Sequence, residues 1–259
     1  MRWLYRVLPL MLLGPLLQAS PLRFVGSDFP GIVQPGSPQP SGLAADVIRT
    51  LCQREQLACS IQLLPWPRAQ AMLPNGQADV LIGPYRTAER AANMRFSRYP
   101  LYVDTLYWYR RSGQNVQWDG RFESLAGLRL GVTRGWTLGQ RFEDAKLRLE
   151  IDTADTLMQS MLKLQRQRLD LVASNDRNAR HTLAQLGNSH IVPILPAISL
   201  HGGYMGYALH AINKPALQRF DQALARLAES GELARLSLNH GLVYPGKHTH
   251  WPDYLRELP

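Results

Sequence analysis

A single arginine is placed to hold an anion in the stretch that runs from Asp79 to Arg90. The apolar run Val-Leu-Ile in this stretch predicts a short strand buried on both faces of an α/β sheet. The Gly83-Pro84 pair is expected to end that strand, and Thr87 is expected to cap a following helix. In open α/β sheets, ligands bind in loops after the carboxyl ends of strands. Because a guanidinium presents a rigid pair of donors, Arg90 is a candidate carboxylate ligand; the alternative is one more surface cation in a basic chain.

Two groups of alternating strand and helix patterns are available to position this residue. Strands are predicted at 22–26, 60–64, 80–82, 102–110, 129–133, 149–152, 169–173, 191–194 and 204–210. Helices are predicted at 43–54, 68–73, 156–167, 178–186, 215–228 and 233–239, with one more from about 138. Such alternation predicts two lobes, each a mainly parallel sheet flanked by helices.

Two extended crossings are expected to join the lobes as a hinge, with a cleft between them. The first is the strand at 102–110, and the second is the strand at 204–210, which His201-Gly202-Gly203 is expected to enter through a turn. Lobe 1 is assigned residues 20–108 and 204–259, and lobe 2 is assigned residues 109–203.

The composition fits a globular protein and gives little support for a nucleic-acid partner. Of the 259 residues, 45% are hydrophobic and 19% charged, and the formal net charge is +9. The Lys and Arg residues are scattered, and no zinc-finger, RNA-recognition or basic-zipper pattern occurs. A basic surface that meets anionic solutes or lipid headgroups is sufficient to explain the charge. Phosphate-loop, dinucleotide and zinc-protease motifs are absent as well, so no cofactor and no metal are expected.

Residues 1–19 have the pattern of a cleaved signal peptide, with a basic start, an apolar run broken by Pro and Gly, and a small residue at Ala19. Export to the periplasm is therefore expected. An oxidising compartment favours a disulfide between Cys52 and Cys59, although two unpaired thiols remain the alternative. Closing so short a loop stabilises the fold by roughly 2.5 kcal/mol in the chain-entropy model.

Motifs spread over most of the chain carry a resemblance to a known family. In order, they are Asp28-Phe29-Pro30, the Cys52/Cys59 pair, Gly76-Gln77-Ala78-Asp79-Val80, Thr87-Ala88-Glu89-Arg90, Phe96-Ser97, Leu125 to Val132, Gly135-Trp136-Thr137 and Ser230-Gly231-Glu232-Leu233. From about Leu22 to Gly241 the chain resembles the periplasmic solute-binding proteins of polar amino-acid ABC transporters, family 3 of the bacterial extracellular binding proteins. The resemblance implies a two-lobe periplasmic binding protein of type II, a monomer that works with a membrane permease.

The resemblance also implies roles for particular residues. Arg90 stands where the family's arginine clamps the ligand carboxylate, helped by backbone N–H groups near Thr137. Phe29 and Trp66 stand where side chains pack against the body of the ligand, although Trp66 can instead be a packing residue. Asp28 lies where several members hold a distal cationic group, and its alternative role is to close an Asx turn.

Two departures from the family pattern concern the candidate site. The first is the loop Gly83-Pro84-Tyr85-Arg86, which is one residue shorter than usual; Pro84 removes one backbone donor, and Tyr85 and Arg86 add bulk and charge.

The second departure concerns the amine-binding acid of amino-acid binders, whose direct match is Asn175, with Asp176 next along. A neutral amide holds an ammonium less well than a carboxylate does, so which of the two faces the cleft bears on the ligand.

The expected function is periplasmic binding of a small carboxylate-bearing solute, an amino acid or related amine, for delivery to an ABC transporter. No enzymatic activity is expected. One alternative is a secreted enzyme resembling cyclohexadienyl dehydratases, for which Asp28, Glu89 and Asp176 are the acids placed to serve. The other alternative is a subunit that presents its bound ligand to a separate membrane sensor.

Overall fold

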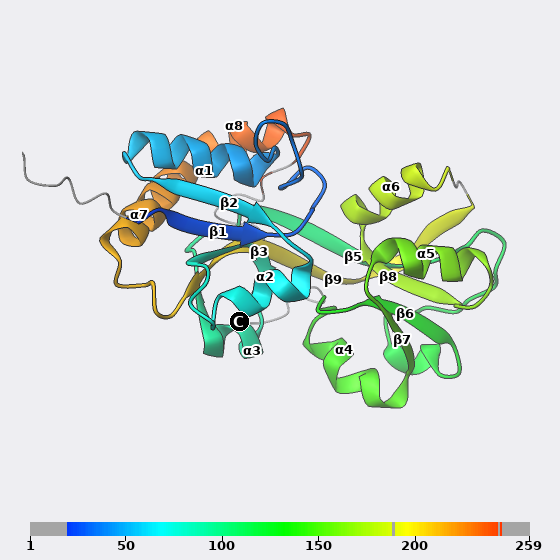
Figure 1. Ribbon diagram of the computed structural model, residues 1–259. Coiled ribbons are helices and arrows are strands. Elements are labelled where there is room, and N and C mark those ends of the chain that lie inside the picture. The colour runs from blue at the N-terminus through cyan, green and yellow to red at the C-terminus, as the bar shows by residue number, and fades with distance from the viewer. Residues whose placement is uncertain (1–19, 188–189, 243, 245–259) are drawn as a thin grey trace, which may run out of the picture.

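The computed structural model describes residues 20–187, 190–242 and 244. The predicted signal peptide 1–19 and the tail 245–259 lie outside the described residues. Figure 1 shows two lobes side by side, with β5 and β9 running from one into the other. In the described part of the chain, no helix combines the length and the apolar character needed to cross a bilayer.

The chain alternates between strands and helices along most of its length. The strands are β1 Leu22–Gly26, β2 Cys59–Leu63, β3 Val80–Tyr85, β4 Met94–Phe96, β5 Tyr102–Arg111, β6 Arg129–Thr133, β7 Glu150–Ala154, β8 Leu171–Asn175 and β9 Ile191–Ala208. The helices are α1 Leu43–Arg54, α2 Trp66–Met72, α3 Ala88–Asn93, α4 Gln140–Ala145, α5 Leu157–Gln165, α6 Asp176–Gln185, α7 Pro215–Glu229 and α8 Glu232–Asn239, with 3-10 turns η1 Phe122–Leu125 and η2 Lys146–Arg148. We call the part with β1 to β4, α1 to α3, α7 and α8 lobe 1, and the part with β6 to β8 and α4 to α6 lobe 2.

The two lobes repeat one strand arrangement. The strand order is β2-β1-β3-β9-β5-β8-β6-β7, with β4 on β9. In lobe 1, β1 is parallel to β2 and β3, and in lobe 2, β6 is parallel to β7 and β8. The third strand of each set pairs with an antiparallel strand that comes from the hinge, β9 on β3 and β5 on β8. Each lobe is therefore a βαβαβ unit completed by one hinge strand.

The second hinge strand, β9, is one long strand where the sequence predicted two separate strands, at 191–194 and 204–210. β9 runs without interruption for 18 residues, so the predicted turn at His201-Gly202-Gly203 was wrong. The glycines serve close packing instead, because a Cβ on Gly203 would lie 2.1 Å from a ring atom of Tyr102. The absence of a side chain at Gly203 lets β9 lie close to β5, where Gly203 pairs with Tyr102.

Buried side chains form one core in lobe 1 and two clusters in lobe 2. The lobe 1 core uses residues between 22 and 102 and between 205 and 233, and the two lobe 2 clusters use residues between 106 and 198. The cores thus change over within β5 and β9, where the strands leave one lobe for the other. The exact limits 108/109 and 203/204 stay a prediction.

Each lobe has an Arg–Asp clamp at the start of its first strand. Arg23 contacts Asp79 through its backbone N–H (3.0 Å) and its guanidinium (3.1 Å), and Arg129 contacts Asp170 in the same way (2.9 and 3.0 Å). Burial opposes ionisation of Asp79, but hydrogen bonds from Arg23 and Lys214 hold its pKa well below the usual range. Hydrogen bonds from Arg129 likewise lower the pKa of Asp170. Both aspartates therefore tie the third parallel strand to the first.

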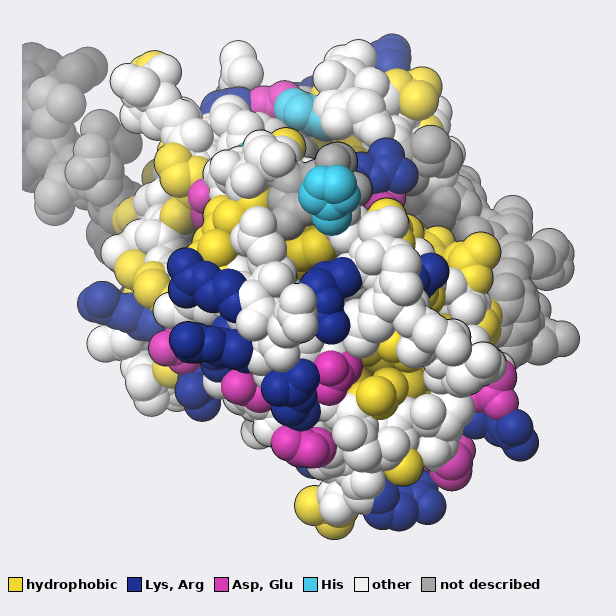
Figure 2. All heavy atoms as spheres, turned by 90° about the vertical axis from the view of Figure 1, so that its right-hand side faces the viewer, with side chains coloured by type: hydrophobic (Ala, Val, Ile, Leu, Met, Phe, Trp, Pro, Cys, Tyr) yellow, Lys and Arg dark blue, Asp and Glu magenta, His cyan; other side chains and the backbone are white. Residues whose placement is uncertain are grey.

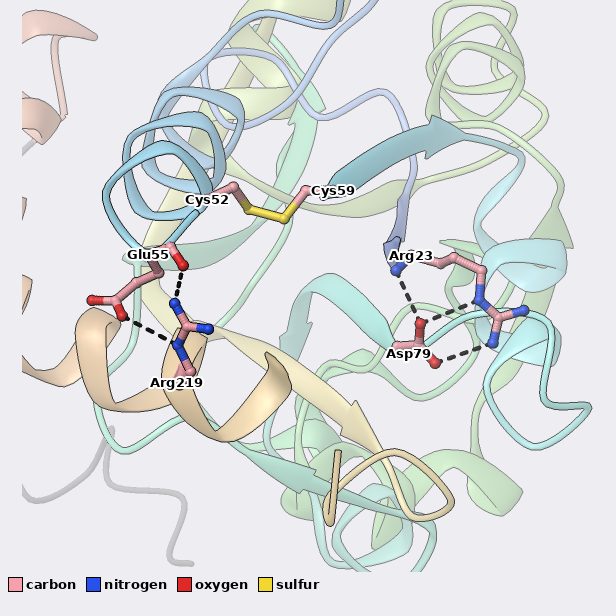
Figure 3. Close-up of a disulfide and its surroundings, with 6 residues drawn as sticks. All are labelled: Arg23, Cys52, Glu55, Cys59, Asp79 and Arg219. Atoms are coloured by element: carbon pink, nitrogen blue, oxygen red, sulfur yellow. Dashed lines mark hydrogen bonds and ion pairs between the residues drawn. A yellow bond between two sulfur atoms is a disulfide. The ribbon is translucent and has the colours of Figure 1, made fainter. Parts of the chain in front are cut away.

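Cys52 and Cys59 form a disulfide, which confirms that prediction. Figure 3 shows it joining the end of α1 to the start of β2, with Arg219 of α7 contacting Glu55 nearby and the Arg23–Asp79 clamp in the same lobe. The disulfide fixes the α1–β2 turn at the rim of lobe 1, where it serves structure.

Charged side chains of both signs are mixed on the lobe 2 end of the molecule. Figure 2 shows Lys and Arg interspersed with Asp and Glu on this face. Several lobe 2 cations form ion pairs, including Arg121–Asp119, Lys163–Asp152 and Arg180–Asp176. On this face the basic residues do not gather into one field of single sign, which is what non-specific nucleic-acid binding uses.

Candidate functional site

A cavity lies between the lobes at the carboxyl ends of β1, β3, β6 and β8. The space between its lining atoms is about 310 Å³, part of which is open to solvent. The lining residues are Phe29, Trp66, Gly83, Tyr85, Arg90, Tyr102, Trp136, Thr137, Asn175, Arg177 and Asn178. Because these strands end facing each other, the loops that follow them meet at one place. Eight of the sequence-predicted site residues lie in this lining, and Asp28 and Asp176 do not.

Arg90 joins the two lobes at the cavity. Thr87 caps α3 as predicted, accepting a hydrogen bond from the Arg90 backbone N–H (3.2 Å). The Arg90 guanidinium donates to the carbonyls of Tyr85 in lobe 1 (3.0 Å) and Gly135 in lobe 2 (3.1 Å). It also lies 5.7 Å from the ring centre of Trp66.

Arg90 has the exposed Glu89 beside it in the chain, whose negative charge acts on it from a distance. It forms no ion pair with an acidic side chain of the described residues, and burial lowers its pKa. The guanidinium still stays cationic, because arginine does not lose its proton in proteins. A partly buried cation whose hydrogen bonds go only to neutral carbonyl oxygens is a favourable place for an anion to bind.

The strand that leads to Arg90 does not end where the sequence predicted. β3 continues through Gly83 and Pro84 to Tyr85, because a register shift between Ile82 and Tyr85 forms an irregularity that accommodates the proline. Gly83 has φ 82°, and its carbonyl accepts a hydrogen bond from the Tyr102 hydroxyl (3.0 Å). A Cβ on Gly83 would lie 2.6 Å from that hydroxyl oxygen, so glycine is required there.

A buried ion pair forms one wall of the cavity. Arg177 donates to both carboxylate oxygens of Asp104 (2.7 and 3.3 Å) and to the carbonyl of Pro30 in lobe 1 (2.8 Å). The Tyr85 hydroxyl donates to the same carboxylate (2.7 Å). Burial, and then the charge of Asp104, raise the pKa of Tyr85, so its hydroxyl keeps its proton.

A neutral histidine supports this wall from behind. The ring of His201 stacks on Tyr85, with 4.9 Å between centres, and its Nε2 lies 3.0 Å from the Ser199 hydroxyl. Burial lowers the pKa of His201 to about 4, so the imidazole is uncharged at neutral pH.

Asn175 lines the cavity, whereas Asp176 points elsewhere. Asn175 caps α6, its Oδ1 accepting from the Asn178 backbone N–H (2.8 Å), and its amide donates to the Tyr85 hydroxyl (3.2 Å). Asp176 lies in the first turn of α6, where it accepts from the Tyr109 hydroxyl (3.3 Å) and pairs with Arg180.

Aromatic side chains form the opposite wall. Phe29 and Trp66 pack with ring centres 5.2 Å apart, and the Trp66 indole N–H donates to the Gly135 carbonyl (3.0 Å) across the cleft. Trp136 and Thr137 complete this side from lobe 2. Asp28 is exposed in the wider cleft outside the cavity. The side chain of Trp66 thus takes part in both packing and the cavity wall.

Sequence reasoning did not find four residues of the site: Tyr102, Asp104, Arg177 and Asn178. Asp104 offered a signal, because it is an acidic residue among the apolar and aromatic side chains of a predicted strand, and burial there would require a cationic partner. The partner itself, Arg177, lies 73 positions away, and no local pattern connects the two.

Metal ligation has no basis in the described residues, which contain no group of three or more His, Cys, Asp or Glu side chains able to hold a metal ion. The cavity instead offers guanidinium and hydroxyl donors on one side and aromatic rings on the other. Such a lining suits an organic anion.

Comparisons with known proteins agree on the fold. A mutant of ArgBP from T. maritima is 21% identical, with 85% of this chain and 94% of that chain covered and a TM-score of 0.71. A histidine kinase sensor domain with similarity to periplasmic binding proteins is 16% identical (88% and 99% covered, TM-score 0.77). The substrate binding protein of an amino acid ABC transporter is 19% identical (85% and 98% covered, TM-score 0.68). The comparison with curated protein sequences found no match.

These likenesses confirm the predicted fold, a two-lobe periplasmic binding protein of type II. The profile of one family covers most of the chain, matching residues 25–242. The protein therefore belongs to the bacterial extracellular solute-binding proteins, family 3.

Proposed function

We propose that the protein is exported to the periplasm, binds a small carboxylate-bearing solute between its lobes, and delivers it to the permease of an ABC transporter. The observation that carries this proposal is Arg90, whose guanidinium lies at the cavity without a carboxylate partner among the described residues. The family to which the chain belongs supports solute binding outside the cytoplasm. Residues 1–19 support export through their signal-peptide pattern.

The contacts of Arg90 also explain how a ligand would close the lobes. The guanidinium already spans both lobes through the carbonyls of Tyr85 and Gly135. A carboxylate on Arg90 that also contacts Thr137 would add bonds that exist in the closed arrangement alone. Because a ligand shifts a conformational balance only through its differential contacts, such a solute would favour the closed form that a permease recognises.

The lining argues for binding rather than catalysis. A dehydratase of this fold would need a general acid inside the cavity. None of the described lining side chains is a carboxylate, and Asp28 is exposed outside the cavity. The buried Tyr85 hydroxyl has a pKa raised well above its ordinary value, which makes it a poor proton donor.

Thermal unfolding in the presence of small acids tests this proposal. A panel of amino acids, 2-oxo acids, dicarboxylates and polyamines would be added to the mature protein, where a ligand at a hundred times its dissociation constant adds about 2.7 kcal/mol of apparent stability. Arg90→Gln should abolish the stabilisation by carboxylates. Arg86→Gln is the matched control, since Arg86 is an exposed arginine just before α3 and outside the cavity lining. An equal stabilisation of Arg90→Gln and the unchanged protein would refute the role of Arg90.

A further inference from the structure

We propose that the solute is a carboxylate that lacks an α-ammonium group, namely a 2-oxo acid or an unsubstituted carboxylic acid with a compact apolar body. This inference rests on the proposed function and names its class of ligand. The arrangement that carries it is a cavity with two guanidinium groups, no described carboxylate in its lining, and a neutral asparagine, Asn175, at the start of α6.

The charges around the cavity favour a ligand with a net negative charge. Arg90 and Arg177 both line the cavity, and Arg90 has no acidic partner among the described residues. Asp104, the carboxylate that neutralises Arg177, is behind the lining and only 4% exposed at its side chain. Among the lining side chains and Asp104, one added carboxylate balances these charges, whereas a zwitterion leaves one positive charge that the exposed Glu89, outside the lining, offsets only from a distance.

Asp104 is fully engaged and does not provide a hidden ammonium site. Its two oxygens accept from Arg177, and one of them also accepts from the Tyr85 hydroxyl. An ammonium that approached Asp104 would have to displace Arg177, which also holds the lobes together through the Pro30 carbonyl.

Asn175 is held in a role that an ammonium ligand would disturb. Its Oδ1, the one acceptor of the side chain, is bonded to the Asn178 backbone N–H as the cap of α6. Its amide N–H₂ is a donor, and it points to the Tyr85 hydroxyl. The side chain therefore uses its oxygen in the helix cap and its amide on Tyr85, and it has no charge with which to hold a cation.

The remaining polar group of the lining also favours an oxygen acceptor. The Thr137 hydroxyl accepts a hydrogen bond from the Gly139 N–H (3.2 Å) and donates to none of the described residues. Its proton is available to a carboxylate or a 2-oxo group. Arg90 and Thr137 thus supply donors at one end, and Phe29 and Trp66 supply apolar surface for the ligand body.

Discrimination against amino acids should be large. An ammonium taken from water into this cavity would lose its hydration without gaining a carboxylate partner, and a charged group left in that state lowers affinity by about 100-fold or more. A 2-oxo group loses only neutral hydrogen bonds and can recover them from Thr137.

Titration calorimetry on matched acids tests the inference. The probes are three sets of equal carbon skeleton: L-phenylalanine, phenylpyruvate and 3-phenylpropanoate; L-leucine, 4-methyl-2-oxopentanoate and 4-methylpentanoate; and L-alanine, pyruvate and propanoate. We expect the tightest binder to be an oxo or unsubstituted acid, with at least about 100-fold weaker binding of its amino counterpart. Asn175→Asp keeps the helix cap, since Asp is as good a cap as Asn, and it should shift that ratio toward the amino acid by tenfold or more.

The outcomes separate the two proposals. Equal or tighter binding of the amino acid in each set, with loss of binding in Arg90→Gln, overturns the ligand class and leaves the proposed function intact. If a folded Asn175→Asp variant leaves the ratio of oxo-acid to amino-acid affinity unchanged, Asn175 has a purely structural role. That result also overturns the ligand class. Carboxylate binding that survives Arg90→Gln, or no binding by any of the nine acids, overturns the proposed function itself.

Discussion

The buried pair between Arg177 and Asp104 should be a main source of stability at the cleft. Its guanidinium and carboxylate lie 2.7 Å apart, and their side chains are only 14% and 4% exposed. Arg177→Met keeps much of the apolar stem and removes the charge, which leaves Asp104 buried with the Tyr85 hydroxyl as its remaining side-chain donor. Breaking a buried pair by removing one partner costs about 3–5 kcal/mol. Because the Tyr85 hydrogen bond stays, we expect a loss near the lower end, about 3 kcal/mol.

Urea unfolding of four proteins measures this effect. The unchanged protein is compared with Arg177→Met, with Asp104→Asn and with the double variant. Because the double variant has no buried unpaired charge, its loss of stability should be about 2 kcal/mol smaller than the sum of the two single losses. Arg180→Met is the matched control, since Arg180 lies on the same helix in an ion pair that is 80% exposed at the arginine. Such a surface pair contributes less than about 1 kcal/mol. If Arg177→Met lowers the free energy of unfolding no more than Arg180→Met does, the Arg177–Asp104 pair is hydrated in solution. The closed arrangement of the lobes is then not the resting one.

Three further perturbations follow from the fold. The pKa of His201 in the folded protein is lowered from 6.5 to about 4, so its contribution to stability is present above pH 6.5 and is lost as the pH falls toward 4. Between pH 7 and pH 5 we expect the free energy of unfolding to fall by about 2 kcal/mol through this residue. His201→Gln should lack this loss, and equal pH profiles of the two proteins would contradict the prediction. Opening the disulfide by Cys52→Ser with Cys59→Ser should lower the free energy of unfolding by about 2–3 kcal/mol, measured by urea titration without reductant, and a loss under 0.5 kcal/mol would contradict this. Gly203→Ala should lower the melting temperature by at least about 4 °C, because the new methyl group overlaps the Tyr102 ring, and an unchanged melting temperature would contradict this.

Local patterns were enough to predict most of the fold and several of the residues that line the cavity. Strand β1 and helix α1 were predicted with their observed limits, and Thr87 caps α3 as expected. Apart from β3 and β9, the predicted limits shift by one or two residues, as for α6, which begins at Asp176 instead of Asn178. These elements follow from hydrophobic period and capping chemistry, which act over a few residues.

The errors arose where a distant contact overrides a local preference. Gly83-Pro84 would end most strands, but the irregular pairing with β9 carries β3 past them. Gly202-Gly203 has the composition of a turn, but the need for glycine at 203 comes from the ring of Tyr102 on the neighbouring strand. Strand β4, three residues long, was not predicted at all, since so short a segment has no period of its own.

The repeated architecture of the lobes has a consequence for how such a pocket acquires selectivity. Arg90 and Arg177 are counterparts, because each belongs to the helix that follows the third parallel strand of its half, α3 after β3 and α6 after β8. Asp104, contributed by a hinge strand, quenches one of them and leaves the other open. Two lobes of similar architecture thereby form a pocket in which only one arginine is left for the ligand carboxylate. Moving that one acid so that it pairs with Arg90 would transfer the carboxylate site to the other lobe.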